Sequence, residues 1–285
     1  MTRRVFVSVL AGALATACSP LAAFNRFAPR DPAVRGPMNV AYGPDPRQRL
    51  DLYAPREKAA KPSPLLVFFY GGAWNSGRRQ DYEWVGQALA SRGFVVAVVD
   101  HRLVPAVRYP AFVEDGALAV ARARELAAAR GGDPERVILA GHSSGAYVAA
   151  MLALSPGWLA DAGVAAGKVR AFAGLSGPYD FYPFDVPSSI EAFRGAPEPR
   201  LTQPVNLDIS AAPPVFLGHG STDVVVEARN SQALAAALRQ AGREVEIEIY
   251  PGLDHKDPVL ALSVLFRGKA PVLDEMTRFL HAHAG

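Results

Sequence analysis

VILAGHSSGAYVAAMLAL, residues 137–154, is the stretch of sequence that decides the fold of this chain. Its first four residues form an apolar run typical of a buried strand, and residues 144–154 have the small apolar composition of a helix. A sharp turn from strand to helix strains the central residue of the Gly-His-Ser-Ser-Gly pattern between them, and glycines permit the close packing that such a turn needs. The pattern predicts Ser143 as an exposed nucleophile. Only Ser143, and not the neighbouring Ser144, has glycine two residues away on both sides.

Strand and helix patterns alternate on both sides of this turn. Strands are predicted at residues 39–42, 49–53, 65–70, 94–99, 137–140, 169–175, 215–217 and 245–250, and helices at 81–92, 110–130, 144–154, about 227–240 and 272–283. Such alternation predicts an α/β protein with a mostly parallel central sheet of about eight strands and helices on both faces. In such sheets functional sites form at the carboxyl ends of the strands.

A serine nucleophile needs a base, and the candidates are His101, His142, His219, His255, His281 and His283. In folds built on this turn, the base follows the acid in the chain and lies in the loop after the last strand. His255 has that position, directly after the predicted strand 245–250. His142 and His219 precede the acid, whereas His281 and His283 lie in the terminal helix. We therefore predict His255 as the general base.

Asp223 is the predicted acid that orients His255. It follows the predicted strand 215–217 through a turn that contains glycine, so that its carboxylate lies at a strand end within reach of a histidine ring. Asp254 and Asp257 are too close to His255 in sequence to orient its ring. Asp208 is the alternative acid.

The sequence Tyr-Gly-Gly-Ala-Trp, residues 70–74, ends the predicted strand 65–70. Backbone N–H groups of a glycine-rich turn can converge on a developing oxyanion, together with the N–H of the residue after the nucleophile. We therefore predict an oxyanion hole made of the N–H groups of Gly72, Ala73 and Ser144. A phosphate cradle is the alternative, but the chain lacks the G-x-G-x-x-G and G-K-[ST] patterns of phosphate-binding loops.

Aromatic side chains gather near the two loops that are expected to border the pocket. We predict that the substrate pocket is lined by Tyr70, Trp74, His142, Tyr179 and Phe181. Packing in the core or in a lid is the alternative role of each aromatic side chain.

The first residues have the features of an export signal. Arg3 and Arg4 precede an apolar run at residues 5–14, and the small residues 15–17 precede Cys18. We predict a signal peptide at 1–17, a tether at 18–37 and a catalytic domain at 38–285. The apolar run is short for a helix that crosses a bilayer, which disfavours a retained transmembrane anchor.

Cys18 is the only cysteine in the chain and therefore cannot form an internal disulfide. The sequence around it resembles a bacterial lipobox, so we predict that Cys18 is lipidated and tethers the protein to a membrane. A periplasmic or secreted protein is the alternative. The sequence does not distinguish the twin-arginine export route from the general secretory route. Arg3 and Arg4 carry two of the three net positive charges, and since no basic run remains beyond them, a nucleic-acid partner is not expected.

These motifs resemble the α/β-hydrolase superfamily, and within it the carboxylesterases similar to hormone-sensitive lipase, to bacterial feruloyl esterases and to arylformamidases. Those groups carry an HGGxW oxyanion loop, a D-Y-R-L segment, a G-x-S-x-G turn, and a late Asp and His. This chain has YGGAW at 70–74 and DHRL at 100–103. Tyr70 thus stands where the family has His, and His101 where it has Tyr.

The resemblance implies an α/β-hydrolase fold and hydrolysis of a carboxylic ester through an acyl-enzyme, with no cofactor and no metal. His255 would take the proton of Ser143 and later return it to the leaving group. The irregular segment 177–211 is short for a large lid, which favours small esters as substrates. An arylformamidase-like amide hydrolase and a catalytically inert binding protein of the same fold are the alternatives.

Overall fold

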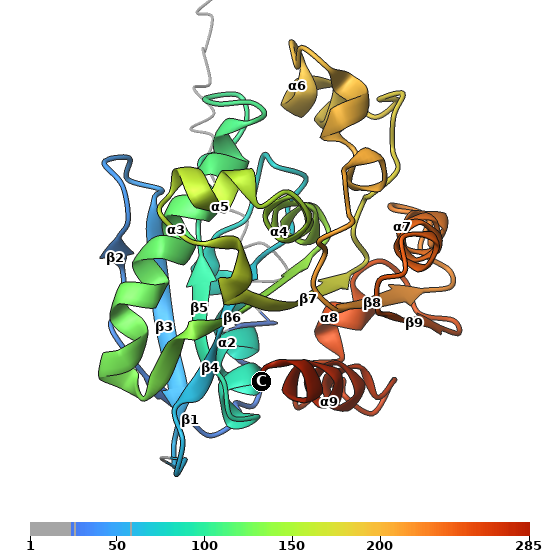
Figure 1. The fold of residues 1–285 in the computed structure, drawn as a ribbon. Helices are drawn as coiled ribbons and strands as arrows, with labels where there is room; N and C mark the ends of the chain where they lie inside the picture. Colours follow the sequence, from blue (N-terminus) through green and yellow to red (C-terminus); the bar gives the residue numbers. More distant parts are fainter. Residues whose placement is uncertain (1–23, 26, 58) are drawn as a thin grey trace, which may run out of the picture.

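The structure, a computed structural model, describes residues 24–25, 27–57 and 59–285. A nine-stranded sheet runs through this part of the chain (Figure 1). Its strands are β1 (Ala33–Arg35), β2 (Val40–Ala41), β3 (Arg49–Pro55), β4 (Ser63–Phe69), β5 (Val95–Val99), β6 (Gly132–His142), β7 (Val169–Leu175), β8 (Val215–Gly220) and β9 (Val245–Tyr250). They lie in the order β1-β3-β5-β4-β6-β7-β8-β9, and β2 pairs with β3.

The sheet is mostly parallel. Strands β5, β4, β6, β7, β8 and β9 pair in parallel, whereas β3 pairs antiparallel with β5, and β1 and β2 pair antiparallel with β3. Parallel strands are buried on both faces, which is why β5 and residues 64–69 of β4 have unbroken apolar sequences. The predicted class, a mostly parallel sheet with helices on both faces, is confirmed.

Successive residues of the central strand β4 enter two separate cores. Leu65, Val67 and Phe69 pack on one face of the sheet, and Leu66, Phe68 and Tyr70 pack on the other. The first face is covered by α3 (Ala111–Ala127), α4 (Ser144–Leu154), α5 (Gly157–Asp161) and α7 (Arg229–Gln240), and the second by α2 (Glu83–Ser91), α8 (Asp257–Leu260) and α9 (Val272–His283) (Figure 1).

The segment 177–211, predicted to be irregular, contains helix α6 (Pro187–Phe193) and the 3-10 turns Pro199–Thr202 and Pro204–Asn206. That prediction is wrong because the prolines begin these helical turns, where the first N–H groups have no intrahelical partner to lose. Figure 1 shows α6 standing outside the layers formed by the sheet and its covering helices. Phe193 on α6 is nevertheless buried, which anchors the segment to the domain.

Part of the expected tether packs on the domain. Strand β1 pairs with β3, and the ring of Phe24 lies 5.3 Å from the ring of Trp84. Arg267 Nη2 donates to Asp31 Oδ2 over 2.7 Å. The chain therefore joins the domain before residue 38, because side chains in this region have partners there. The predicted signal peptide at 1–17 and Cys18 lie outside the described residues.

Among the residues that the structure describes, no helix is both long and apolar enough to cross a bilayer.

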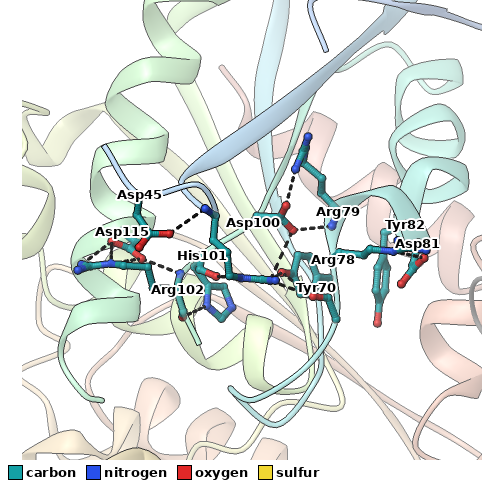
Figure 2. A network of polar contacts seen from close by, with 12 residues as sticks. Asp45, Tyr70, Arg78, Arg79, Asp81, Tyr82, Asp100, His101, Arg102 and Asp115 are labelled. Carbon is teal, nitrogen blue, oxygen red and sulfur yellow. Dashed lines mark hydrogen bonds and ion pairs between the residues drawn. The ribbon is translucent and has the colours of Figure 1, made fainter. Parts of the chain in front are cut away.

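A buried polar network joins β3, the loop after β4 and the end of β5 (Figure 2). The guanidinium of Arg79 pairs with Asp100, and its Nε lies 2.9 Å from Asp51 Oδ1. The backbone N–H of Arg79 donates to Asp100 Oδ1 over 2.6 Å. The side-chain Nη2 of Arg79 donates to Asn39 Oδ1 over 2.8 Å. Because Arg79, Asp51 and Asp100 are all buried, each charge depends on its partners for stabilisation.

The two departures from the family pattern meet in this network. The rings of Tyr70 and His101 stack with their centroids 5.7 Å apart and an interplanar angle of 16°. Arg47 donates to the Tyr70 hydroxyl over 2.7 Å and to the carbonyl oxygens of His101 and Gly77, each over 2.9 Å. Because Gly77 closes the loop after β4, these bonds hold that loop against the segment that follows β5.

Replacing Arg79 tests the contribution of the network to stability. In an Arg79→Met variant Asp51 and Asp100 remain buried without their cation, so the free energy of unfolding should fall by about 3–5 kcal/mol. Arg122, which pairs with Glu125 on the surface, provides the control, and Arg122→Met should cost less than about 1 kcal/mol. Urea denaturation followed by circular dichroism measures both. Equal losses in the two variants would show that the network does not stabilise the fold.

Candidate active site

Ser143 sits in a sharp turn between β6 and α4. Its backbone has φ 52° and ψ −128°, an unfavourable conformation for a residue with a side chain, and its N–H donates to the carbonyl of Leu175 over 2.9 Å. A Cβ atom on Gly145 would lie 2.2 Å from the carbonyl oxygen of Phe69. Glycine is therefore required at this position, because α4 begins in direct contact with the backbone of β4.

The structure brings the hydroxyl of Ser143, the imidazole of His255 and the carboxylate of Asp223 into one hydrogen-bonded line. His255 Nε2 lies 2.9 Å from Ser143 Oγ, and His255 Nδ1 lies 2.7 Å from Asp223 Oδ2. The three residues follow the carboxyl ends of β6, β8 and β9. This arrangement can remove the proton from the serine hydroxyl and stabilise the imidazolium that results.

The loops that carry the acid and the base are bonded to each other. Thr222 donates to the carbonyl of Leu253 through its N–H over 3.1 Å and through Oγ1 over 2.8 Å. The N–H of Gly252 donates to Ser221 Oγ over 2.9 Å. A Cβ atom on Gly220 would lie 2.2 Å from the carbonyl oxygen of Leu253, so this contact too requires glycine. The separation of Asp223 and His255 is thus fixed by the backbone.

Asp223 is fully buried and receives donors on both carboxylate oxygens. The N–H groups of Val225 and Val226 each donate to Oδ1 over 2.9 Å, while His255 Nδ1 and His219 Nε2 approach Oδ2. Burial by itself would raise the pKa of the Asp223 carboxyl. The hydrogen bonds from His219, His255 and Val226 outweigh it and hold that pKa well below its usual value. Asp223 therefore remains charged at neutral pH.

His142 has a different position from the one predicted. It is buried rather than exposed in the substrate pocket, and its Nε2 lies 3.0 Å from the backbone carbonyl oxygen of His255. A carbonyl can only accept, so Nε2 carries the proton. Burial lowers the pKa of His142 to about 3, with a smaller contribution from the neighbouring His255. His142 thus acts as a neutral donor that fixes the backbone of His255.

The loop after β4 lies against the nucleophile. The N–H of Gly72 donates to the side-chain Oγ of Ser144 over 3.1 Å, so this amide is already engaged and does not point to an oxyanion as predicted. Ala73 and Trp74 have φ values of 50° and 59°, in the left-handed region that residues with a side chain rarely adopt. Ala73 and Ser144 both line the cavity beside Ser143. Because Ser144 opens α4, its N–H has no carbonyl one turn earlier to bond.

A cavity of about 350 Å³ opens at Ser143. Trp74 and Phe181 line it, and their rings stack with centroids 5.8 Å apart. The prediction that Tyr70 and Tyr179 line the pocket is corrected. Both are buried elsewhere, Tyr70 in the polar network below the loop and Tyr179 against Phe172.

Sequence reasoning missed several residues that line the cavity. They are Val186 on the segment 177–211, Val224 and Val225 directly after the acid, and the polar group Asp185, Glu227, Arg229 and Asn230. Val224 and Val225 are 90% and 68% exposed. Their position next to Asp223 was a usable signal, because residues that follow the acid must surround the same strand end. Asp208, the alternative acid, is exposed, and its Oδ1 accepts from the N–H of Ser210 over 3.1 Å.

The chain is similar in sequence and in fold to known proteins. The BD-FAE family model matches residues 50–238. Isoprenylcysteine alpha-carbonyl methylesterase ICME of Arabidopsis thaliana is 31% identical over 265 residues, which make up 86% of this chain and 62% of the plant protein. Carboxylesterase NlhH of Mycobacterium tuberculosis is 30% identical over 246 residues, or 77% of this chain and 75% of that protein. The chain spans less than two thirds of the length of the plant relative.

A solved structure of esterase B from Lactobacillus rhamnosis with a tributyrin phosphonate has a similar fold. The TM-score is 0.79 at 21% identity, and the match covers 93% of this chain and 90% of that chain. This likeness shows the α/β-hydrolase fold.

Acid should destabilise the folded protein through His142. In the unfolded chain this histidine takes up a proton below pH about 6.5, whereas burial keeps it neutral in the folded state down to about 3. The free energy of unfolding should therefore fall by about 2 kcal/mol between pH 7 and pH 5 through this residue alone. A His142→Gln variant keeps an N–H donor and does not titrate. Urea denaturation at pH 7, 6 and 5 should give it a shallower decline, and parallel declines would contradict this role.

Proposed function

The chain belongs to the BD-FAE family, and on that premise we propose that it is a serine esterase that hydrolyses small carboxylic esters through an acyl-enzyme intermediate. The observation that carries the proposal is the 2.9 Å approach of His255 Nε2 to Ser143 Oγ at the wall of an open cavity. The bond between His255 and Asp223 supports it, because a base needs a partner that orients its ring.

Acylation begins at the Ser143 hydroxyl. Oγ attacks the ester carbonyl carbon while His255 Nε2 takes the hydroxyl proton, which gives a tetrahedral intermediate and an imidazolium. Asp223 stabilises that cation through Nδ1 and keeps the ring in the tautomer whose Nε2 can accept. Collapse of the intermediate breaks the bond to the alcohol oxygen, and His255 returns the proton to that oxygen. Ser143 is then left as an acyl ester.

Deacylation reverses the same proton path. His255 takes a proton from a water molecule, the hydroxide adds to the acyl carbon, and the proton returns to Ser143 Oγ as the carboxylic acid leaves. The N–H groups of Ala73 and Ser144 are the proposed donors to the oxyanion in both steps, since both residues border the cavity at Ser143. The N-terminus of α4 adds a favourable dipole at the same point.

The cavity favours small substrates with an apolar group. Trp74, Phe181 and Val186 provide apolar walls, and the volume of about 350 Å³ lies at the lower end of small-molecule sites. The plant relative is named for a methylesterase activity, which is compatible with a small alcohol group here. The charged side chains Asp185, Glu227 and Arg229 at the same cavity would face the more polar end of the ester.

A fluorophosphonate probe tests the nucleophile. It should label the wild-type protein and leave Ser143→Ala unlabelled, because only an activated hydroxyl displaces the fluoride. Ser210→Ala, a change in an exposed loop, should label like wild type. Ser143→Ala should also lower ester turnover by at least about 1,000-fold. Absence of labelling in folded wild-type protein would favour an inert binding protein of this fold.

The bond that is cleaved can be determined with matched substrates. Aryl acetates and butyrates should be hydrolysed faster than N-formyl aryl amides, since the proposed reaction expels an alcohol. Faster cleavage of the amides would favour the arylformamidase-like alternative, which uses the same side chains.

We also propose that the protein is exported and anchored to a membrane by a lipid on Cys18. The support is the sequence alone, in which two arginines, an apolar run and small residues precede a single cysteine. In bacterial cells expressing the full chain, the wild type should partition into the detergent phase of a Triton X-114 extract. Cys18→Ser removes the thiol to which lipid attaches and should move the protein to the aqueous phase. Identical partitioning of the two would contradict the anchor.

A further inference from the structure

His219 is a buried histidine for which the mechanism above has no task. It lies on β8 with no exposed surface. Its Nε2 is 3.2 Å from Asp223 Oδ2 and 2.7 Å from the carbonyl oxygen of Val226. Its Nδ1 is 2.7 Å from the hydroxyl of Ser231, a fully buried residue of α7. Both ring nitrogens therefore have partners, and one of these is the acid of the proposed triad.

The surroundings of the ring determine its tautomer. Nε2 faces a carboxylate and a carbonyl, which are both acceptors, so the proton must be on this nitrogen. The Ser231 hydroxyl can then donate to Nδ1, the acceptor nitrogen of a neutral imidazole. With Ser231 as its partner, His219 donates its Nε2–H to the carbonyl oxygen of Val226 and brings the same N–H within 3.2 Å of Asp223 Oδ2.

This N–H, which is shared with the carbonyl oxygen of Val226, is a fourth donor near the carboxylate. Oδ1 is held by the backbone of Val225 and Val226, but Oδ2 is shared between His255 and His219. Without His219, Oδ2 would be held only by the ring that it has to orient. His219 belongs to a strand of the central sheet, so its position is fixed by the sheet. The side chain of His255 is on a loop and does not have this support.

We propose that His219 is a positioning residue, which keeps the Asp223 carboxylate in register with His255. Its Nε2–H holds the carbonyl of Val226, whose own N–H donates to Asp223 Oδ1, and also approaches Asp223 Oδ2, while Ser231 holds the ring through Nδ1. The series of side chains in polar contact then runs from Ser231 through His219, Asp223 and His255 to Ser143. This role rests on the proposed esterase function. It predicts a loss of turnover rather than of substrate binding, since His219 is buried behind the acid and does not line the cavity.

Two substitutions distinguish the effect of losing the N–H donor from the effect of losing the ring. In His219→Gln the amide nitrogen is as many bonds from Cβ as Nε2 is in histidine, so the donor to Asp223 is kept. His219→Phe keeps a ring of similar shape without a donor. With p-nitrophenyl butyrate, His219→Phe should lower kcat by about 10- to 100-fold with KM within about 2-fold of wild type. His219→Gln should recover kcat to within about 3-fold.

Ser231→Ala tests how the ring is held and provides a second test if His219→Phe does not fold. Losing the hydroxyl leaves Nδ1 without its donor and the ring less firmly held against Asp223, so kcat should fall by about 3- to 10-fold without a change in KM. His281→Gln is the control, because His281 is an exposed residue of α9 whose ring stacks on Phe94 and lies 2.7 Å from the carbonyl oxygen of Arg92. Circular dichroism verifies folding, and the rate of fluorophosphonate labelling reports the reactivity of Ser143 without a substrate.

The outcomes distinguish this role from the proposed function. The role is overturned if folded His219→Phe keeps the kcat of the wild type, or if kcat falls equally in His219→Gln and His219→Phe. It is also overturned if the substitutions change KM instead of kcat. If His219→Phe does not fold, unchanged kcat in Ser231→Ala overturns the role. A wild-type protein that neither hydrolyses esters nor reacts with the probe would overturn the proposed esterase function itself, and this role with it.

Discussion

The contact between the start of α4 and the end of β4 is the constraint on which the site depends. A Cβ atom at Gly145 would lie 2.2 Å from the carbonyl oxygen of Phe69, so α4 can begin here only with glycine at this position. That approach forces Ser143 into its strained turn and presents the hydroxyl to the cavity. It also places the loop after β4 next to the nucleophile, where Gly72 bonds to Ser144. Nucleophile and oxyanion loop are therefore positioned by one backbone contact.

Charge in the site is organised by burial and by donors. Asp223 keeps its charge because four donors surround it, whereas His142 and His101 are held neutral chiefly by burial. A neutral His142 can donate to the carbonyl of His255 without placing a second cation beside the imidazolium that forms during acylation. The geometry thus provides one anion, one base and uncharged supports.

The two positions at which this chain differs from the family pattern, Tyr70 and His101, lie in contact in the structure. Tyr70 and His101 stand on different loops, and each has the residue type that the family has at the other position. The two rings stack, which forms an aromatic contact between the loops. Arg47 then bonds to the Tyr70 hydroxyl and to the His101 carbonyl. Two departures that look independent in the sequence are therefore neighbours in the fold.

The sequence by itself determined the alternation of strands and helices, the turn at Ser143 and the positions of Asp223 and His255 at strand ends. These features depend on local periodicity and on the order of residues along the chain, which a single sequence displays. Only the tertiary structure decided that β1 joins the sheet, that the Gly72 amide is engaged by Ser144, and that Val186 rather than Tyr179 lines the cavity. Each of these depends on a contact between segments distant in the chain, and no local pattern encodes such a distance.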